Sequence, residues 1–231
     1  MNPSLLPSYA ELQCVSHYTF LHGSSAPEQL VQRAASLGYH ALAIADECTV
    51  AGVVKAHMAA KEAGLKLIVG SQMLVTPEDG TPAFSLLILA MKKNGYGNLC
   101  ELITVARRRA KKGEYLVRPR DIAAPPPDLV ALRGMPDCQL ILLPRYGVAV
   151  EVLERQAAWL LQCAAGRARI ALTLHFRSRD EQHRNAVTSV AAQFDLPVVA
   201  TGDVVMHVRS AKPLQDTMTA IRHGVPVARC G

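Results

Sequence analysis

Histidine and carboxylate side chains follow several short apolar stretches of this sequence. The segment Glu11–Gly23 passes from an apolar run into a turn that carries His17 and His22. Asp46-Glu47 and Asp203 each follow a later apolar run. Imidazole and carboxylate groups bind divalent metal ions, and a bound metal ion can activate water for hydrolysis. The sequence therefore raises the question of a metal-dependent hydrolytic site, either intact or without its metal.

The elements that position these residues alternate along the chain. Runs of strand-forming residues predict strands over Glu11–Val15, Ala41–Asp46, Lys66–Val75, Ala83–Ala90, Gln139–Leu143, Arg169–Phe176 and Pro197–Asp203. Apolar residues at helical spacing predict helices from Ser25 to Leu37 and over Gly52–Ala63, Tyr96–Ala110, Val150–Ala165, Asp180–Phe194 and Lys212–His223. Strands separated by helices indicate an α/β fold with a parallel sheet, and this number of units favours a closed, TIM-barrel-like (βα)7 barrel.

Such a barrel would be a single domain over residues 1–231, with parallel strands ringed by helices. Its chemistry would lie at the carboxyl ends of the strands, where His22, Glu47 and Asp203 are expected to meet. No GxGxxG or GxxxxGK[ST] pattern is present, which disfavours a dinucleotide- or NTP-binding fold.

Three local signals predict where individual elements begin and end. Ser25 is expected to cap the first helix, with Pro27 in its first turn and Glu28 completing a capping box. The turn Thr76–Gly80 precedes the fourth strand. The prolines at 119 and 125–127 predict a linker that is neither helix nor central strand.

Composition indicates a folded protein. Half of the 231 residues are hydrophobic, 19% are charged and the net charge is +6, which is compatible with nucleic-acid binding but does not require it. The cysteines contain no CxxC pair and fall in apolar runs, so we expect free, mostly buried thiols and a cytoplasmic protein. No signal peptide or membrane span is expected, since the apolar runs are only strand-length.

Four stretches of the chain together carry a family resemblance: Leu12–Gly23, Ala41–Val53, Ala63–Gly70 with Leu89-Ala90 and Gly95–Leu99, and Leu196–Val204. They resemble the PHP domain, a (βα)7-type barrel of phosphoesterases and of the N-terminus of bacterial C-family DNA polymerases. The Gly-Tyr-x-Asn-Leu element at Gly95–Leu99 is typical of the polymerase PHP domains. Asp46-Glu47-Cys48 and Met206–Ser210 are similar to the error-prone branch of these polymerases.

The resemblance implies a site with several metal ions and many His, Asp and Glu ligands, but most ligand positions differ here. The expected His-x-His of the first strand is Gln13-Cys14-Val15, and the acid before the glycine is His22. The Asp-His after strand two is Asp46-Glu47, and the closing Asp-x-His is Asp203-Val204-Val205.

Three further positions also lack the expected ligand. Gln72 stands for an acid after strand three, Ser85 for a histidine that opens strand four, and Arg145-Tyr146 for the ligand after strand five. Only His22, Glu47 and Asp203 remain as candidates for a single weakly bound metal. We therefore expect no catalytic residues, no cofactor and no working metal centre in this segment.

Other polar residues have structural interpretations. His17 is expected to be a turn residue and His175 a structural histidine, while a bulge at Val205 could turn His207 toward the site. We expect Asp46 to cap the next helix. The basic run Arg107–Lys112 is either a solvated helix end or a contact for DNA phosphate or an acidic neighbouring domain.

The resemblance implies an N-terminal PHP domain of an error-prone DNA polymerase that replicates past damage and serves DNA repair. In that case this segment has a structural or interaction role and is not catalytic alone. The parent would be a nucleotidyltransferase that uses Mg2+ in its polymerase region. Its partners would be the rest of the polymerase chain, DNA and accessory translesion-synthesis proteins, without a membrane. The alternative is a free-standing metal-dependent phosphoesterase with a reduced metal site.

Overall fold

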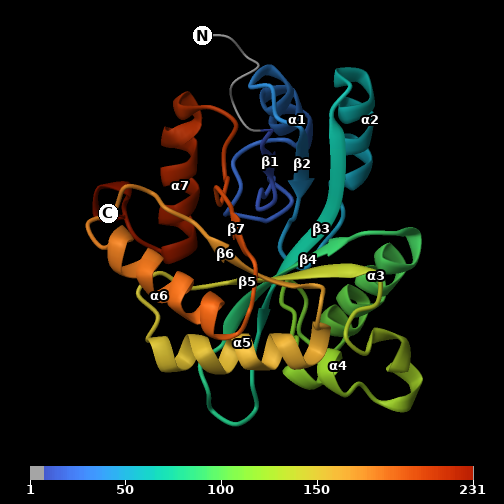
Figure 1. The fold of residues 1–231 in the computed structure, drawn as a ribbon. Helices are drawn as coiled ribbons and strands as arrows, with labels where there is room; N and C mark the ends of the chain where they lie inside the picture. The colour runs from blue at the N-terminus through green and yellow to red at the C-terminus, as the bar shows by residue number, and fades with distance from the viewer. Residues whose placement is uncertain (1–7, 231) are drawn as a thin grey trace. The chain divides into compact units, whose positions relative to one another are not determined.

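The computed structural model describes residues 8–230 of the chain. Its strands are β1 (Ala10–Glu11), β2 (Ala41–Ile44), β3 (Lys66–Val75), β4 (Phe84–Ala90), β5 (Cys138–Leu143), β6 (Ala168–Leu172) and β7 (Val198–Ala200). Its α-helices are α1 (Pro27–Ser36), α2 (Val53–Ala63), α3 (Lys93–Arg108), α4 (Pro119–Ala123), α5 (Val150–Ala164), α6 (Asp180–Gln193) and α7 (Lys212–His223). Every predicted strand and helix is present in the predicted order (Figure 1).

The strands pair in chain order from β1 to β7, which confirms the predicted α/β class and (βα)7-type strand order. Most pairs are parallel, but β4 is antiparallel to both β3 and β5. The prediction of an entirely parallel sheet is wrong there, because a turn and not a helix connects β3 to β4. Two strands joined by a short turn run in opposite directions. A parallel bridge between Cys14 and Val204 pairs the segments that follow β1 and β7.

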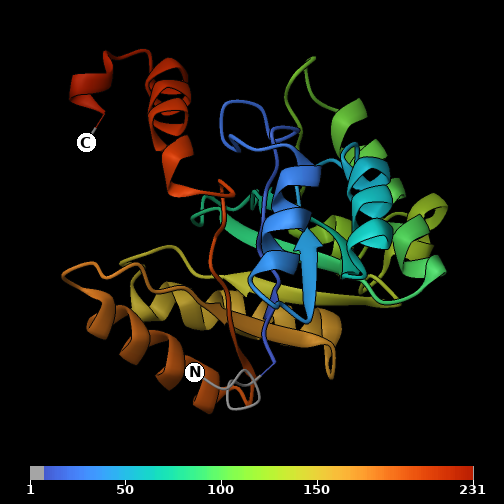
Figure 2. The ribbon, with the colours of Figure 1, turned by 90° about the horizontal axis from the view of Figure 1, so that it is seen from above.

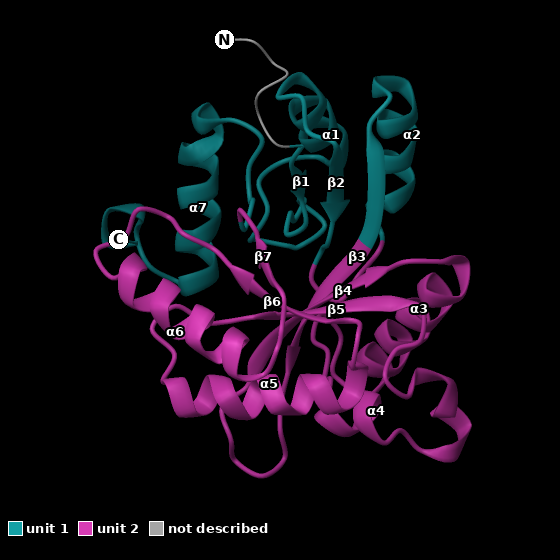
Figure 3. Ribbon diagram, in the orientation of Figure 1, with its two compact units in different colours: residues 1–46, 51–69, 203–231 teal, residues 47–50, 70–202 magenta. Residues whose placement is uncertain are grey.

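The described residues divide into two compact units, shown in teal and magenta in Figure 3. Unit 1 comprises residues 8–46, 51–69 and 203–230, and unit 2 comprises residues 47–50 and 70–202. Neither unit is continuous in sequence. The assignment of residues 1–231 to one domain stays a prediction.

Unit 1 has its own hydrophobic core between two helices and β2. Every residue of β2 is buried. Leu30 and Val31 of α1 pack with Leu42 of β2, while α2 contributes only alanines to this core. Alanine side chains let the α2 backbone approach α1 closely, so this small core is tightly packed.

The first turn of α1 differs from the prediction. Ala26, and not Ser25, is the N-cap residue, and the side chain of Gln29, and not of Glu28, accepts a 2.9 Å hydrogen bond from the Ala26 N–H. Pro27 lies at the start of the helix as predicted, where its missing N–H has no cost. The reason for the shift is that the Ser25 hydroxyl contacts His207 instead.

Unit 2 contains the larger hydrophobic core. The central residues of β4, Leu86 to Leu89, are all buried, as are Leu140 and Leu142 of β5. Helices α5 and α6 pack along β5 and β6 (Figure 2). Burial on this scale accounts for the near-continuous apolar sequence of these strands.

The segment predicted as a linker contains helix. Pro119 begins α4, and Pro127 begins the 3-10 helix η2 (Pro127–Leu132). The prediction is wrong because proline disrupts a helix only in its interior and is well suited to the first turn. Asp121, three residues after the N-cap, accepts the N–H of Arg118 at 2.8 Å and stabilises the start of α4.

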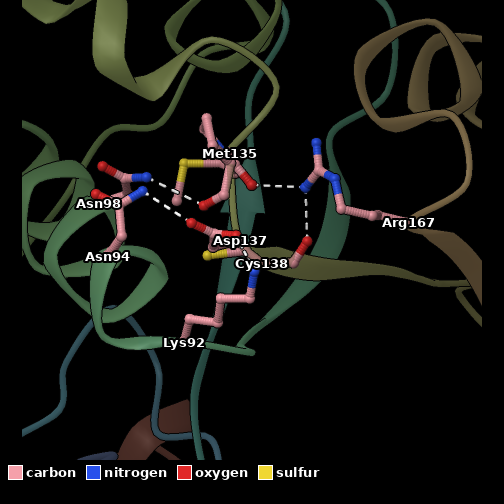
Figure 4. A network of polar contacts seen from close by, with 8 residues as sticks. Lys92, Asn94, Asn98, Met135, Asp137, Cys138 and Arg167 are labelled. Carbon is pink, nitrogen blue, oxygen red and sulfur yellow. Dashed lines mark hydrogen bonds and ion pairs between the residues drawn. The ribbon is translucent and has the colours of Figure 1, made fainter.

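The turn before β5 is held by Arg167 (Figure 4). Gly134, Met135 and Asp137 all have positive φ. Arg167 donates hydrogen bonds to the carbonyls of Met135 and Cys138, both at 2.6 Å, and of Gly134 at 2.7 Å. A charged donor on three carbonyls offsets the cost of these uncommon conformations.

Helix α3 contacts the same turn through the Gly-Tyr-x-Asn-Leu element (Figure 4). A Cβ at Gly95 would lie 2.1 Å from the carbonyl oxygen of Asp137, so only glycine fits. The Asn98 amide donates to the Pro136 carbonyl at 3.1 Å, and Asn94 donates to the Asp137 carboxylate at 3.1 Å. The element therefore docks α3 against the start of β5.

Within residues 8–230, no helix combines the length and the apolar character that a bilayer crossing requires.

Candidate functional site

The segment after β1 carries an amide where the resemblance implies a histidine ligand. The Gln13 side chain is buried, and its Nε2 donates a 2.9 Å hydrogen bond to Oδ1 of Asp203. The backbone N–H of Gln13 donates to the Glu11 carboxylate at 2.8 Å. An amide nitrogen has no lone pair for a metal ion, and here it donates to an oxygen of Asp203, a residue that the resemblance implies as a metal ligand.

Asp46 stabilises the turn after β1. It is buried, and its carboxylate accepts hydrogen bonds from the N–H and hydroxyl of Ser16 and from the hydroxyl of Thr19, all at 2.7 Å. The prediction that Asp46 caps the next helix is wrong, since Gly52 is the N-cap residue of α2 and no side chain caps it. The carboxylate is already committed to the turn that carries the histidines.

Three histidines of unit 1, His17, His22 and His207, have protein partners. Nδ1 of His22 lies 2.5 Å from Nη1 of Arg222 on α7, and the His22 carbonyl accepts from Gln215 at 2.7 Å. The N–H of His17 donates to the Ser25 carbonyl at 2.9 Å, in keeping with a turn residue.

His207 also has a fixed partner. Its Nδ1 lies 2.7 Å from the buried Ser25 hydroxyl, which accepts the His207 N–H at 2.9 Å. The hydroxyl is thus left to donate to Nδ1, and the ring is held against the start of α1. Rotation of the His207 ring toward a metal site would break the contact between Nδ1 and the Ser25 hydroxyl.

In unit 2, Glu47 lies in a network with an arginine and a tyrosine. The Tyr115 hydroxyl donates to Oε1 of Glu47 at 2.6 Å and accepts the Leu74 N–H at 2.9 Å. Burial and the adjacent Glu47 carboxylate raise the pKa of Tyr115, so the phenol remains a donor at neutral pH. Gln72 pairs with Glu47 through a parallel bridge.

Arg107 connects this network to the basic run. Its guanidinium donates to the carbonyls of Glu47 and Cys48 at 3.2 Å and lies over the Tyr115 ring at 5.3 Å. Arg109 forms a 2.6 Å ion pair with the buried Asp121. Two cations of the run are thus structural, a role that neither sequence interpretation included, while Arg108, Lys111 and Lys112 are left for solvent or a partner.

The thiols are poorly suited to metal binding. All the cysteines are free, as predicted, and Cys14, Cys48 and Cys138 are buried. Burial raises the pKa of Cys48 and of Cys138 to about 11, so both are protonated at neutral pH.

The residues present do not fit the multi-metal centre that the resemblance implies. Among residues 8–230, no three His, Cys, Asp or Glu side chains form a group that could hold a metal ion. The side chains of Val15 and Val205 have no atom that could bind a metal ion. The Asp203 and Asp46 carboxylates accept hydrogen bonds from the protein. We therefore derive no catalytic step through a metal.

The predicted site residues are divided between the units. His22 and Asp203 belong to unit 1 and Glu47 belongs to unit 2, so their convergence at one mouth stays a prediction. Sequence reasoning did not predict Tyr115, Arg107 or Ser25 as partners of these residues. Their contacts join segments far apart in the chain, and no local pattern marks them.

Sequence comparisons with known proteins match this chain to a family. A sequence profile of the PHP domain matches residues 11–125. The chain is 53% identical over 229 residues to an error-prone DNA polymerase of Ralstonia nicotianae, covering 99% of this chain and 21% of that protein. It is 50% identical over 234 residues to an error-prone DNA polymerase of Burkholderia mallei, covering 98% of this chain and 22% of that protein.

A solved structure agrees at the level of the fold. A candidate metal-dependent phosphoesterase from Bifidobacterium adolescentis superimposes with a TM-score of 0.57 at 18% identity, over 88% of this chain and 89% of that one. The chain spans about a fifth of the length of the curated relatives that it matches. The profile match, the relatives and the strand order agree, and the chain belongs to the PHP domain family in the form found in error-prone DNA polymerases.

Proposed function

We propose that this chain is the N-terminal PHP domain of an error-prone DNA polymerase, and that it has a structural and interaction role without hydrolytic activity of its own. Identity of about one half over nearly the whole chain to polymerases of this kind supports the first part. The small share of each relative that the chain spans supports a domain within a longer protein.

The observation that carries the structural role is the hydrogen bond from Gln13 to Asp203. The resemblance implies a histidine at position 13 that would bind a cation together with Asp203. Here the Gln13 amide N–H, which carries a partial positive charge, contacts the Asp203 carboxylate itself. Asp46 and Glu47 accept donors from Thr19 and Tyr115 in a similar way. Protein donors thus take the place that cations hold in a metal-loaded site.

The parent protein would be a nucleotidyltransferase that extends primers past damaged DNA and serves repair. Its polymerase region would use Mg2+ held by carboxylates to activate the primer hydroxyl and stabilise the leaving pyrophosphate. Its partners would be the remainder of the polymerase chain, DNA and accessory translesion-synthesis proteins. Its location would be the cytoplasm.

The second candidate is a free-standing metal-dependent phosphoesterase with a reduced site on His22, Glu47 and Asp203. The structural likeness to a candidate phosphoesterase favours it, though only through the fold. It requires a metal ion to displace the Arg222 contact of His22 and the Gln13 contact of Asp203.

Hydrolysis assays on this chain separate the two candidates. With Mn2+ or Zn2+ present, we expect no release of phosphate from a phosphomonoester and no shortening of a labelled primer beyond the protein-free blank. The longer parent protein should extend a primer across a lesion in the presence of Mg2+. Metal-dependent hydrolysis that is lost in Asp203→Asn would support the phosphoesterase and contradict the proposed role.

A further inference from the structure

Two neighbouring loops of unit 2 combine an exposed aromatic ring with unpaired arginines. Strands β5 and β6 are parallel neighbours, with Leu140 opposite Ala168 and Leu142 opposite Ile170. The loops that follow them, residues 144–149 and 173–179, therefore leave the same edge of the sheet.

Phe176 projects fully into solvent. Its relative exposure is 105%, the highest of the exposed large apolar residues in the described chain, and its φ is 58°. A bulky residue with positive φ is rare, because its Cβ crowds the backbone. An apolar ring presented in this way has both faces available to a flat ligand.

Three arginines accompany this ring: Arg145, Arg177 and Arg179 are all exposed. Among residues 8–230, none of them is in an ion pair with a carboxylate. Asp180 and Glu181 follow in the first turn of α6, and Glu181 pairs with Arg184 at 3.6 Å. The two loops therefore carry an excess of positive charge.

Tyr146 joins the two loops. The Arg177 guanidinium lies over its ring at 4.8 Å, and its hydroxyl accepts the Arg179 N–H at 3.0 Å. Its ring also packs against the buried His183 at 5.3 Å. The basic loop is thus anchored to the folded unit on both sides of Ser178. The Arg177 guanidinium and the Arg179 backbone are held close in sequence to Phe176, which lowers the entropic cost of binding.

We propose that these loops form a contact for single-stranded DNA, in which Phe176 stacks on a base and Arg145, Arg177 and Arg179 contact phosphates. An aromatic platform beside cations is the combination that binds unpaired nucleotides, whereas a duplex hides the faces of its bases. The basic run at Arg107–Lys112 has no aromatic residue within it and lacks this combination. The choice of DNA among anionic polymers rests on the proposed function.

The test is the fluorescence anisotropy of a labelled oligothymidylate of about 15 nucleotides, titrated with this chain at low salt. Phe176→Ala should weaken binding about tenfold or more, and Phe176→Trp should retain it. Phe20→Ala is the matched control, because Phe20 is also exposed, at 84%, but has no part in the contact. Binding should be unchanged in this control.

The arginines are tested through the salt dependence. Each of Arg145→Ala, Arg177→Ala and Arg179→Ala should weaken binding and lower the slope of log K against log salt by about 0.7. Arg33→Ala, at an exposed position of α1, should leave the slope unchanged.

Three results would overturn the proposal: no binding by the unmodified chain, equal binding by Phe176→Ala, or equal competition by a polyglutamate peptide, which would indicate an acidic protein partner. If any of these occurs while the longer protein still extends primers, the contact fails and the proposed function stands. Stacking-dependent binding by a chain that also hydrolyses phosphoesters would support the contact and contradict the proposed function.

Discussion

Asp46, Glu47 and Asp203 each accept a hydrogen bond from a neutral side chain of the same unit. Asp46 is buried, whereas Glu47 and Asp203 are half-buried. Carboxylates withdrawn from water require partners, and hydroxyl or amide donors supply them here. At the residue scale, hydroxyl and amide donors contact the carboxylates that the resemblance implies as metal ligands. We therefore expect the stability of the site to depend on Gln13 and Tyr115 and not on metal supply.

Removing the Tyr115 hydroxyl should destabilise the fold. Tyr115→Phe deletes the hydrogen bonds to Glu47 and from the Leu74 N–H, and we expect a loss of about 1–2 kcal/mol in the free energy of unfolding. Urea denaturation measures this loss. Tyr18→Phe is the control, since no described residue bonds its hydroxyl, and it should stay within about 0.5 kcal/mol of the unmodified chain. Equal stability of the two variants would contradict the role of the network.

The buried thiols predict a loss of stability in alkali. Cys48 and Cys138 have pKa values of about 11 in the folded chain, against an ordinary value of 9.0. Between these values the unfolded chain releases protons that the folded chain retains, so the free energy of unfolding should fall as the pH rises from 9.0 to about 11. Urea titrations across this range should show the fall, and Cys48→Ala should make it shallower. An unchanged slope in this variant would show that Cys48 is not a source.

At the scale of elements, many features could be predicted from local sequence. Apolar runs placed each strand. The predicted helix ends at Leu37, Ala63 and His223 are each followed by a glycine with positive φ, the residue type that this conformation favours. Two errors came from local rules applied too broadly. The turn at 76–80 already implied an antiparallel β4, and proline at 119 and 127 begins a helix turn as readily as it ends one.

Docking of α3 through Gly95 gives a prediction with a control on the same helix. Gly95→Ala would place a Cβ 2.1 Å from the Asp137 carbonyl oxygen, whereas nothing lies within 4 Å of a Cβ at Gly97. We expect Gly95→Ala to cost at least about 2 kcal/mol in the free energy of unfolding. Gly97→Ala should raise it, by up to about 1 kcal/mol, through helix propensity. Thermal and urea unfolding would measure both, and a neutral Gly95→Ala would refute the close approach.

At the scale of the whole chain, the sequence could identify the family but not the protein contacts made at the expected ligand positions. The Gln13 and Asp203 pair is separated by 190 residues, and the Ser25 and His207 pair by 182. Neither partner carries a local signal of the other, because such pairs depend on which strand ends the fold brings together. Sequence comparison of ligand positions indicated what was missing, while only the structure showed which donors are present.

Stability of the whole chain should be independent of divalent cations. Ligands that bind the folded state raise the thermal midpoint of unfolding. Carboxylates that already accept hydrogen bonds from the protein are expected to bind no divalent cation tightly enough to raise it. We expect equal midpoints in EDTA and in excess Mn2+ by differential scanning calorimetry. An increase of several degrees in Mn2+ corresponds to more than about 1 kcal/mol for a chain of this length and would reveal a metal site.

Metal stoichiometry tests the central claim most directly. The purified chain would be soaked in Zn2+ or Mn2+, desalted and analysed by mass spectrometry for bound metal per chain. We predict well under one equivalent of metal per chain. Gln13, Val15 and Val205 stand where histidine ligands are implied, and Nδ1 of His22 contacts the Arg222 guanidinium. Retention of two or more equivalents would contradict the account of a PHP domain held together by its own side chains.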